Sequence, residues 1–144
     1  HASKMAVKRF IQMGHRHVGI INHDTRHHDF CQTLEGFLEA HRELQLPIHP
    51  HAIVQNYQNK TASIPIDPRQ ITAWICTYNG AVNLLADRCH DEGLSIPQDV
   101  SLICFDSANE KITAAVGKRI SVIRPDAANT AQTIIACLKD CHNR

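Results

Sequence analysis

The chain has 144 residues, enough for one domain or part of one, in which roughly two-thirds of the unfolded surface is buried. Its 15 Lys and Arg are balanced by 14 Asp and Glu, so the formal net charge is only +1. Without a basic run or stripe, this chain lacks the electrostatic footprint of a nucleic-acid-binding domain. No apolar stretch approaches the roughly twenty residues of a membrane span, and no signal peptide is recognisable.

The first half of the chain alternates between helical and extended patterns. A β-branched run predicts a strand at 18–22. Residues at helical spacing between Phe30 and His41 mark one face of a second helix, which is predicted to end near Leu46-Pro47. Residues 52–55 predict a weak strand, and residues 58–68 at most a short helix. A first helix over residues 2–13, stopped by Gly14, is predicted by apolar residues at helical spacing: Ala2, Met5, Ala6, Phe10 and Met13.

The second half continues the alternation. The uncharged runs 73–77 and 100–105 predict parallel strands that are covered on both faces. Between them, a helix capped by Asn79 or Tyr78 is stopped by Gly93. A loop at 107–119, a short strand at 120–123 and a helix at 127–138 complete the chain. Strands separated by helices predict the α/β class, with a parallel sheet inside a three-layer α/β/α arrangement.

Polar residues follow directly after the predicted strands. In open parallel sheets, ligands bind beyond the carboxyl ends of the strands, so we predict a ligand site there. Amides, aromatic rings and carboxylates can bracket a small polyhydroxylated ligand. The alternatives are that Asn79 only caps its helix and that Asp106 only bonds loop amides. The strand-end residues are Asn22, His23, Asp24, Asn56, Tyr57, Tyr78, Asn79, Asp106 and Ser107.

The six cysteines include no C-x-x-C pair. Cys76 and Cys104 fall in apolar strand runs, where cysteine packs as a small hydrophobe. Cys137 and Cys141 are four residues apart on a helix, but no second ligand pair follows at zinc-site spacing. We therefore predict reduced thiols and a cytoplasmic protein.

The eleven histidines concentrate near the first strand, with five of them between His15 and His28. Adjacent residues such as His27 and His28 point apart on a helix or loop, so we predict a solvated polar segment rather than a metal site. Metal binding is the alternative, since imidazole is a common ligand.

Signatures of catalysis are missing from the sequence. Ser107 has no G-x-S-x-G elbow around it, and no G-x-G-x-x-G or P-loop occurs anywhere. We predict no enzymatic activity, no catalytic residue and no cofactor.

Four motifs in order resemble the effector-binding domain of the LacI/GalR transcription regulators. They are Gly14-His15-Arg16, then Glu35-Gly36-Phe37, then ITAWICTYN at 71–79, and EGLSIPQDVSLICFD at 92–106, which matches best. The likeness covers most of the chain, and it gives the otherwise costly Gly36 a context.

The resemblance implies a Rossmann-like C-terminal lobe of a type I periplasmic-binding-protein-like fold. Residues 1–144 would form a single lobe, with 1–123 as the lobe proper and 124–144 as a helix that packs on the N-terminal lobe or on a neighbouring chain. The DNA-binding headpiece of the family is absent from this chain. Family members are bacterial repressors that act as dimers, so the resemblance implies a homodimer, with operator DNA bound only through a headpiece.

The resemblance also implies the ligand-binding residues. Asp106 matches an acidic residue of the family that contacts the effector. Thr33 stands where the family has an effector-binding Arg, so a bidentate charged donor is lost. The family's Asn-Asp pair is replaced by Tyr78 and Asn79, and the stretch 56–68 is shorter than usual. With the strand-end residues, the predicted ligand-binding set is Asp106, Tyr78, Asn79, His23, Thr33 and Tyr57.

We therefore predict a non-enzymatic effector-sensing domain of a LacI/GalR-type repressor, which binds a small, sugar-like molecule. The alternative is a periplasmic sugar-binding protein of an uptake system.

Overall fold

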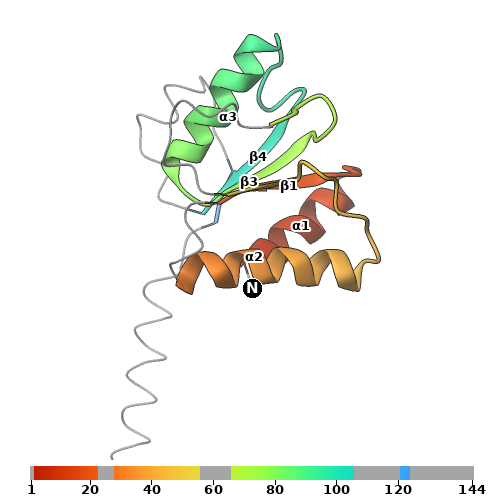
Figure 1. Cartoon of the computed structure of the whole chain (residues 1–144). Coiled ribbons are helices and arrows are strands. Elements are labelled where there is room, and N and C mark those ends of the chain that lie inside the picture. The colour runs from red at the N-terminus through yellow and green to blue at the C-terminus, as the bar shows by residue number, and fades with distance from the viewer. Residues whose placement is uncertain (1, 23–27, 56–65, 106–120, 124–144) are drawn as a thin grey trace, which may run out of the picture.

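The computed structural model describes residues 2–22, 28–55, 66–105 and 121–123 (Figure 1). The strands form one five-stranded sheet in the order β2-β1-β3-β4-β5, and every neighbouring pair is parallel. The predicted α/β class and parallel sheet are therefore confirmed. Along the chain the elements are α1 (Ala2–Gln12), β1 (Val18–Ile21), α2 (His28–Glu43), β2 (Ile53–Val54), β3 (Ala73–Cys76), α3 (Asn79–Asp91), β4 (Ser101–Cys104) and β5 (Ser121–Val122).

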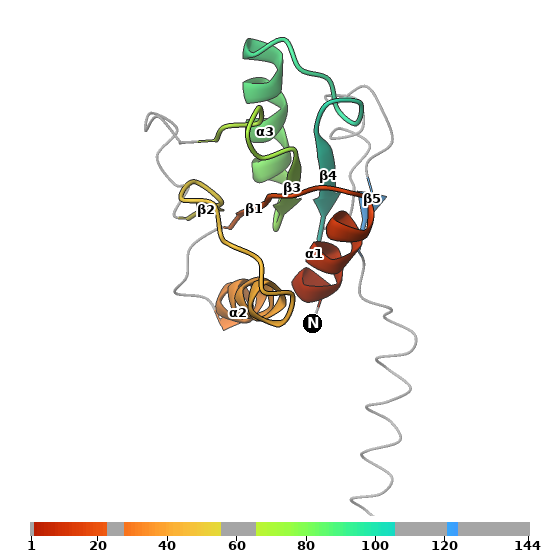
Figure 2. The ribbon, with the colours of Figure 1, turned by 90° about the vertical axis from the view of Figure 1, so that its right-hand side faces the viewer.

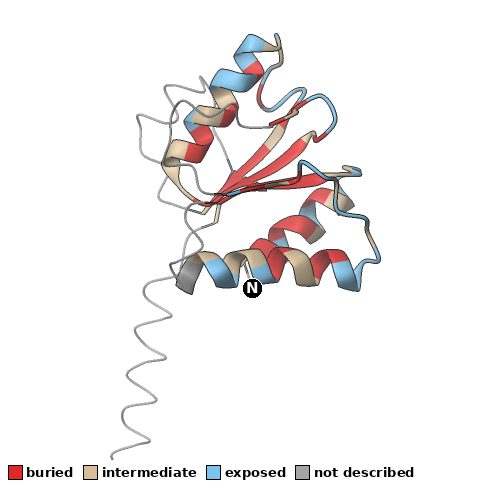
Figure 3. Cartoon of the chain, in the orientation of Figure 1, coloured by how far each residue is buried: buried red, intermediate tan, exposed pale blue. Residues whose placement is uncertain are grey.

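Helices cover both faces of the sheet. Helices α1 and α2 lie side by side on one face and α3 lies on the other, as two views at right angles agree (Figures 1 and 2). All four residues of β1 and of β3 are buried, as strands sandwiched between helices require. The buried residues gather on the sheet and on the helix faces turned toward it (Figure 3).

The buried side of α1 includes only part of its apolar pattern. Met5 and Met13 are 65% and 54% exposed, although they belong to the same pattern as the buried Ala6 and Phe10. The Ser3 hydroxyl donates to the Thr33 carbonyl of α2 at 2.6 Å, and this small residue turns toward α2 in place of Met5. The buried stripe has helical spacing and consists of Ser3, Ala6, Val7 and Phe10.

All three described helices end in a Schellman motif. One residue after the C-cap adopts a left-handed conformation, and the next N–H donates to the carbonyl five residues back, at 3.1, 2.9 and 2.7 Å for α1, α2 and α3. The sequence predicted such helix stops at Gly14 and Gly93, but not at the end of α2. The left-handed residues are Gly14, Gln45 and Gly93, with φ of 94°, 52° and 67°.

His15 ties together the N-terminal ends of two strands. Its Nδ1 lies 2.9 Å from Thr72 Oγ1 and its Nε2 lies 3.0 Å from Ser101 Oγ. Burial lowers the pKa of His15, which favours the neutral ring. This motif histidine therefore joins β3 to β4 at the edge of the sheet opposite the strand ends.

Candidate functional site

The strand ends form a common edge, as the predicted site requires. The last residues of β1, β3 and β4 are register partners, namely Ile21, Cys76 and Cys104. His23, Tyr78 and Asp106 each follow two residues later in the chain. His23, Asp106 and Tyr57 lie outside the described residues, whereas Tyr78, Asn79 and Thr33 lie within them.

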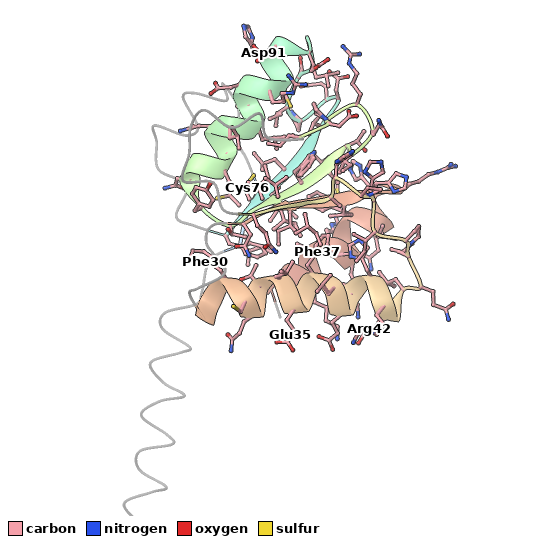
Figure 4. All side chains as sticks on the ribbon, in the orientation of Figure 1. Phe30, Glu35, Phe37, Arg42, Cys76 and Asp91 are labelled. Atoms are coloured by element: carbon pink, nitrogen blue, oxygen red, sulfur yellow. The ribbon has the colours of Figure 1, made fainter. Side chains whose placement is uncertain are left out.

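A buried amide network joins this edge to the start of α2. Asn22 is fully buried directly after β1, and its Nδ2 donates to the Phe30 carbonyl at 3.0 Å. Thr77, which follows β3, donates its hydroxyl to Asn22 Oδ1 at 3.1 Å. Figure 4 labels Phe30 at the start of α2, next to the strand ends. Asn22 thus fixes the first turn of α2 against two strands.

Tyr78 links β3 to α3. It is the N-cap residue of α3, with extended backbone (φ −156°, ψ 164°), and it makes no side-chain capping bond. Its half-buried ring packs against the hydrophobic core, and its hydroxyl oxygen is buried. The aromatic face therefore lies at the strand-end edge, where the sequence predicted it.

Asn79 is the first residue inside α3, because Tyr78 occupies the N-cap position. The alternative that Asn79 only caps its helix is therefore wrong. Its Oδ1 is buried, and it accepts no hydrogen bond within the part of the chain that the structure describes. A buried amide oxygen without a donor costs about 1–3 kcal/mol, which makes Oδ1 of Asn79 an unusual feature of this helix start.

Thr33 lies on the other side of the sheet from Tyr78 and Asn79. It is a half-buried residue of α2, and its carbonyl receives the Ser3 hydroxyl of α1. Because α2 and α3 cover opposite faces of the sheet, the structure does not bring Thr33 together with Tyr78 and Asn79.

A hollow also lies away from the strand ends. A cavity of about 870 Å³ lies against the outward side of α2, between Cys31 and Arg42, and all of its described lining residues belong to that one helix. No described strand-end residue contributes to it, so it is separate from the predicted site.

The buried thiols of Cys76 and Cys89 favour the protonated form. Burial raises the pKa of Cys76 well above its usual value, and burial and the nearby Asp99 raise that of Cys89 to about 11. Among the described residues, no group of three or more His, Cys, Asp or Glu side chains is arranged to hold a metal ion. Of the helices in those ranges, none is both long and apolar enough to cross a membrane.

Residues 7–144 match the model of the periplasmic binding protein-like domain. The chain belongs to this family. The curated relatives of this periplasmic binding protein-like domain include the "Probable opine utilization operon repressor" of Rhizobium rhizogenes, which is 28% identical over 96% of this chain and 77% of that protein.

Further relatives support the same family. The transcriptional repressor PurR of Aliivibrio fischeri is 24% identical over 93% of this chain and 42% of the repressor. In three dimensions, the domain resembles a sugar-binding transcriptional regulator of the LacI family from Escherichia coli, solved with phosphate. That likeness has a TM-score of 0.71 at 17% identity, over 92% of this chain and 49% of the other. The resemblance to LacI/GalR effector-binding domains is thus confirmed, and this domain spans about half the length of these last two proteins.

Sequence reasoning missed two features of the site. It placed Asn22 at a strand end but could not show that its amide holds the first turn of α2, eight residues later. It also gave no role to Gly80, which follows Asn79 in α3. The sequence contains one signal for such a role, because glycine has poor helix propensity and Gly80 stands in the first turn of a predicted helix.

Proposed function

We propose that this chain is the effector-sensing domain of a LacI/GalR-type transcription regulator, whose DNA binding responds to a small sugar-like molecule at the strand ends. The observation that carries the proposal is the match of 96% of the chain to a repressor, at 28% identity. Residues 1–123 would form the lobe proper, and residues 124–144 a helix that packs on another lobe or chain. That last segment lies outside the described residues.

The described residues support a neutral, hydroxylated ligand. Asn79 offers a buried amide oxygen, and Tyr78 offers an aromatic surface that can cover the apolar face of a sugar ring. Thr33 adds no charge where the family has an Arg, which disfavours a ligand that depends on a bidentate anion contact. Asp106, His23 and Tyr57 complete the proposed set, because each follows a strand that ends at this edge.

In this proposal, the whole protein binds its effector without chemical turnover, contacts operator DNA through a headpiece, and acts as a cytoplasmic homodimer. The final helix, with Ile134, Ile135 and Leu138, would pack within that dimer; these residues lie outside the described ranges. A periplasmic sugar-binding protein of an uptake system is less well supported, because the curated relatives reported above are repressors.

Calorimetry on the full-length protein tests the ligand proposal. The titrants are D-ribose, D-glucose, D-fructose and their phosphates, and the variant is Asp106→Ala. Charge-assisted hydrogen bonds contribute about 1.5–3 kcal/mol each, so the variant should bind at least about tenfold more weakly. Asp87→Ala, at an exposed position of α3, is the matched control and should bind normally. Equal affinity of the wild type and Asp106→Ala would contradict this assignment.

DNA binding tests the regulator proposal. The full-length protein should bind a specific duplex, and an added effector should change that affinity. The present chain alone, with a net charge of +1, should not be retained on duplex DNA at physiological salt. Sequence-specific binding of DNA by this chain would contradict a separate headpiece.

A further inference from the structure

Gly80 and Tyr78 are in unusually close contact at the start of α3. A Cβ atom built on Gly80 would lie 2.7 Å from Cε2, 3.2 Å from Cδ2 and 3.9 Å from Cζ of the Tyr78 ring. The first distance is shorter than any normal carbon–carbon contact. The ring therefore occupies space that every residue other than glycine would fill.

Glycine is otherwise a poor choice at this position. It lowers helix stability by up to about 1 kcal/mol relative to Ala, and the backbone of Gly80 is helical, so no left-handed conformation calls for it. The contact with the Tyr78 ring is the feature of the structure that explains it.

A side chain at position 80 would displace the ring rather than the helix. The clashing atoms belong to a half-buried side chain with two rotatable bonds, whereas the helix backbone is held by its hydrogen bonds. The displaced ring would move away from the first turn of α3, which begins at Asn79. The shape of the strand-end edge thus depends on the residue at position 80.

We propose that Gly80 is a positioning residue of the effector site, which acts through Tyr78. Its missing Cβ leaves room for the aromatic ring against the start of α3, where Asn79 is the first helical residue, and so sets which hydroxylated ligand fits. This inference rests on the proposed function, because it assumes that the strand-end edge is the ligand site.

Two measurements on the full-length protein test the ring position without any ligand. In the first, 3-fluorotyrosine is incorporated at position 78 alone, and the ¹⁹F resonance is compared between wild type, Gly80→Ala and the control Asn83→Ala, which is exposed on α3. In the second, the melting temperature is measured for Gly80→Ala in the wild-type and Tyr78→Ala backgrounds. We expect the resonance to shift in Gly80→Ala only, and the substitution to raise the melting temperature only in the Tyr78→Ala background.

The same variants are then titrated with the tightest-binding sugar or sugar phosphate of the panel named above. Gly80→Ala should weaken binding by about tenfold or more, and Asn83→Ala should not. An unshifted resonance together with equal stability effects in both backgrounds would overturn the inference, and so would unchanged affinity in Gly80→Ala. Failure of the wild type to bind any compound of the panel would instead contradict the proposed function, while the ring measurements still decide whether Gly80 positions Tyr78.

Discussion

Gly19 of β1 and Trp74 of β3 are register partners in the sheet, and the indole ring lies over the Gly19 backbone. A Cβ on Gly19 would lie 2.4 Å from both Cε3 and Cζ3 of Trp74. Trp74 is fully buried and its Nε1 donates to the Ile71 carbonyl at 2.6 Å, so the ring cannot retreat without breaking that bond. The Trp74 indole therefore occupies the space that a side chain at position 19 would fill.

Substitution of Gly19 by Ala should destabilise the protein. Overpacking of a well-packed core costs about 1–3 kcal/mol, and here the clash involves a rigid ring that is held by a hydrogen bond. Urea unfolding followed by far-UV circular dichroism measures the loss, and this signal remains when the single tryptophan is replaced. The double variant with Trp74→Phe removes part of the obstructing ring, so Gly19→Ala should cost less in that background. Equal costs in the two backgrounds would show that the indole is not the obstacle.

Replacement of Gln45 by Gly should stabilise the protein. Gln45 has a φ of 52° after α2, and an L-residue in the left-handed region costs about 1–2 kcal/mol relative to its ordinary conformation. Glycine adopts that conformation without strain but loses more backbone entropy, so the net gain should be about 0.5–1 kcal/mol. Gly93→Ala is the matched control, because it makes the reverse change at the end of α3 and should destabilise by a similar amount. A lower melting temperature for Gln45→Gly would contradict the strain argument.

These helix ends show what the sequence could and could not reveal. Gly14 and Gly93 were predicted as helix stops because a glycine after an apolar periodic run is a local signal, whereas Gln45 adopts the same geometry with no such signal. The parallel sheet followed from uncharged apolar runs separated by helices. The exposure of Met5 could not be predicted, because it depends on how α1 meets α2, which a single helix pattern does not contain.

For the candidate site, the sequence predicted the positions of residues but not their contacts. Tyr78 and Asn79 could be placed at the strand ends, because a parallel sheet brings all its carboxyl ends to one edge. The partners of Asn22 could not be predicted, since its bonds to Phe30 and Thr77 depend on where α2 starts and on the register of β1 with β3. Close approaches such as that of Gly80 to the Tyr78 ring likewise exist only in three dimensions.

Removal of the Asn22 amide should cost at least about 2 kcal/mol. Asn22→Leu removes the bond to the Phe30 carbonyl and the bond from the Thr77 hydroxyl, and each contributes about 1 kcal/mol. Thr77→Val removes the hydroxyl that lies within hydrogen-bond distance of Asn22 Oδ1 and of the Ile21 carbonyl, but it leaves the bond from Asn22 to Phe30 and should cost less. Asn83→Ala, at an exposed position, should lie within about 0.5 kcal/mol of wild type. Chemical unfolding of the three variants provides the comparison, and a loss for Asn22→Leu no larger than for Asn83→Ala would contradict the role of the network.

Stability should fall on acidification, beginning near pH 6.5. Burial lowers the pKa of both His15 and His41 in the folded protein, although a hydrogen bond to the Phe37 carbonyl partly opposes this at His41. The unfolded chain then binds more protons than the folded chain at pH values between the two pKa values. The contribution of the neutral rings is therefore fully present above the unfolded pKa of about 6.5 and is lost as the pH falls through the folded values.

The two histidines can be separated from the carboxylates by their pH range. Hydrogen bonds from Lys4 and Lys8 lower the pKa of Glu43, so its contribution is present above the ordinary value of 4.5 and disappears only at lower pH. His15→Gln keeps an amide near the Thr72 and Ser101 hydroxyls but does not titrate, so it should flatten the dependence just below about pH 6.5. His51→Gln, at an exposed position, is the control and should keep the wild-type slope. Urea unfolding at half-unit intervals from pH 4 to 8 gives these slopes, and a wild-type slope in His15→Gln would show that His15 does not contribute to the acid sensitivity.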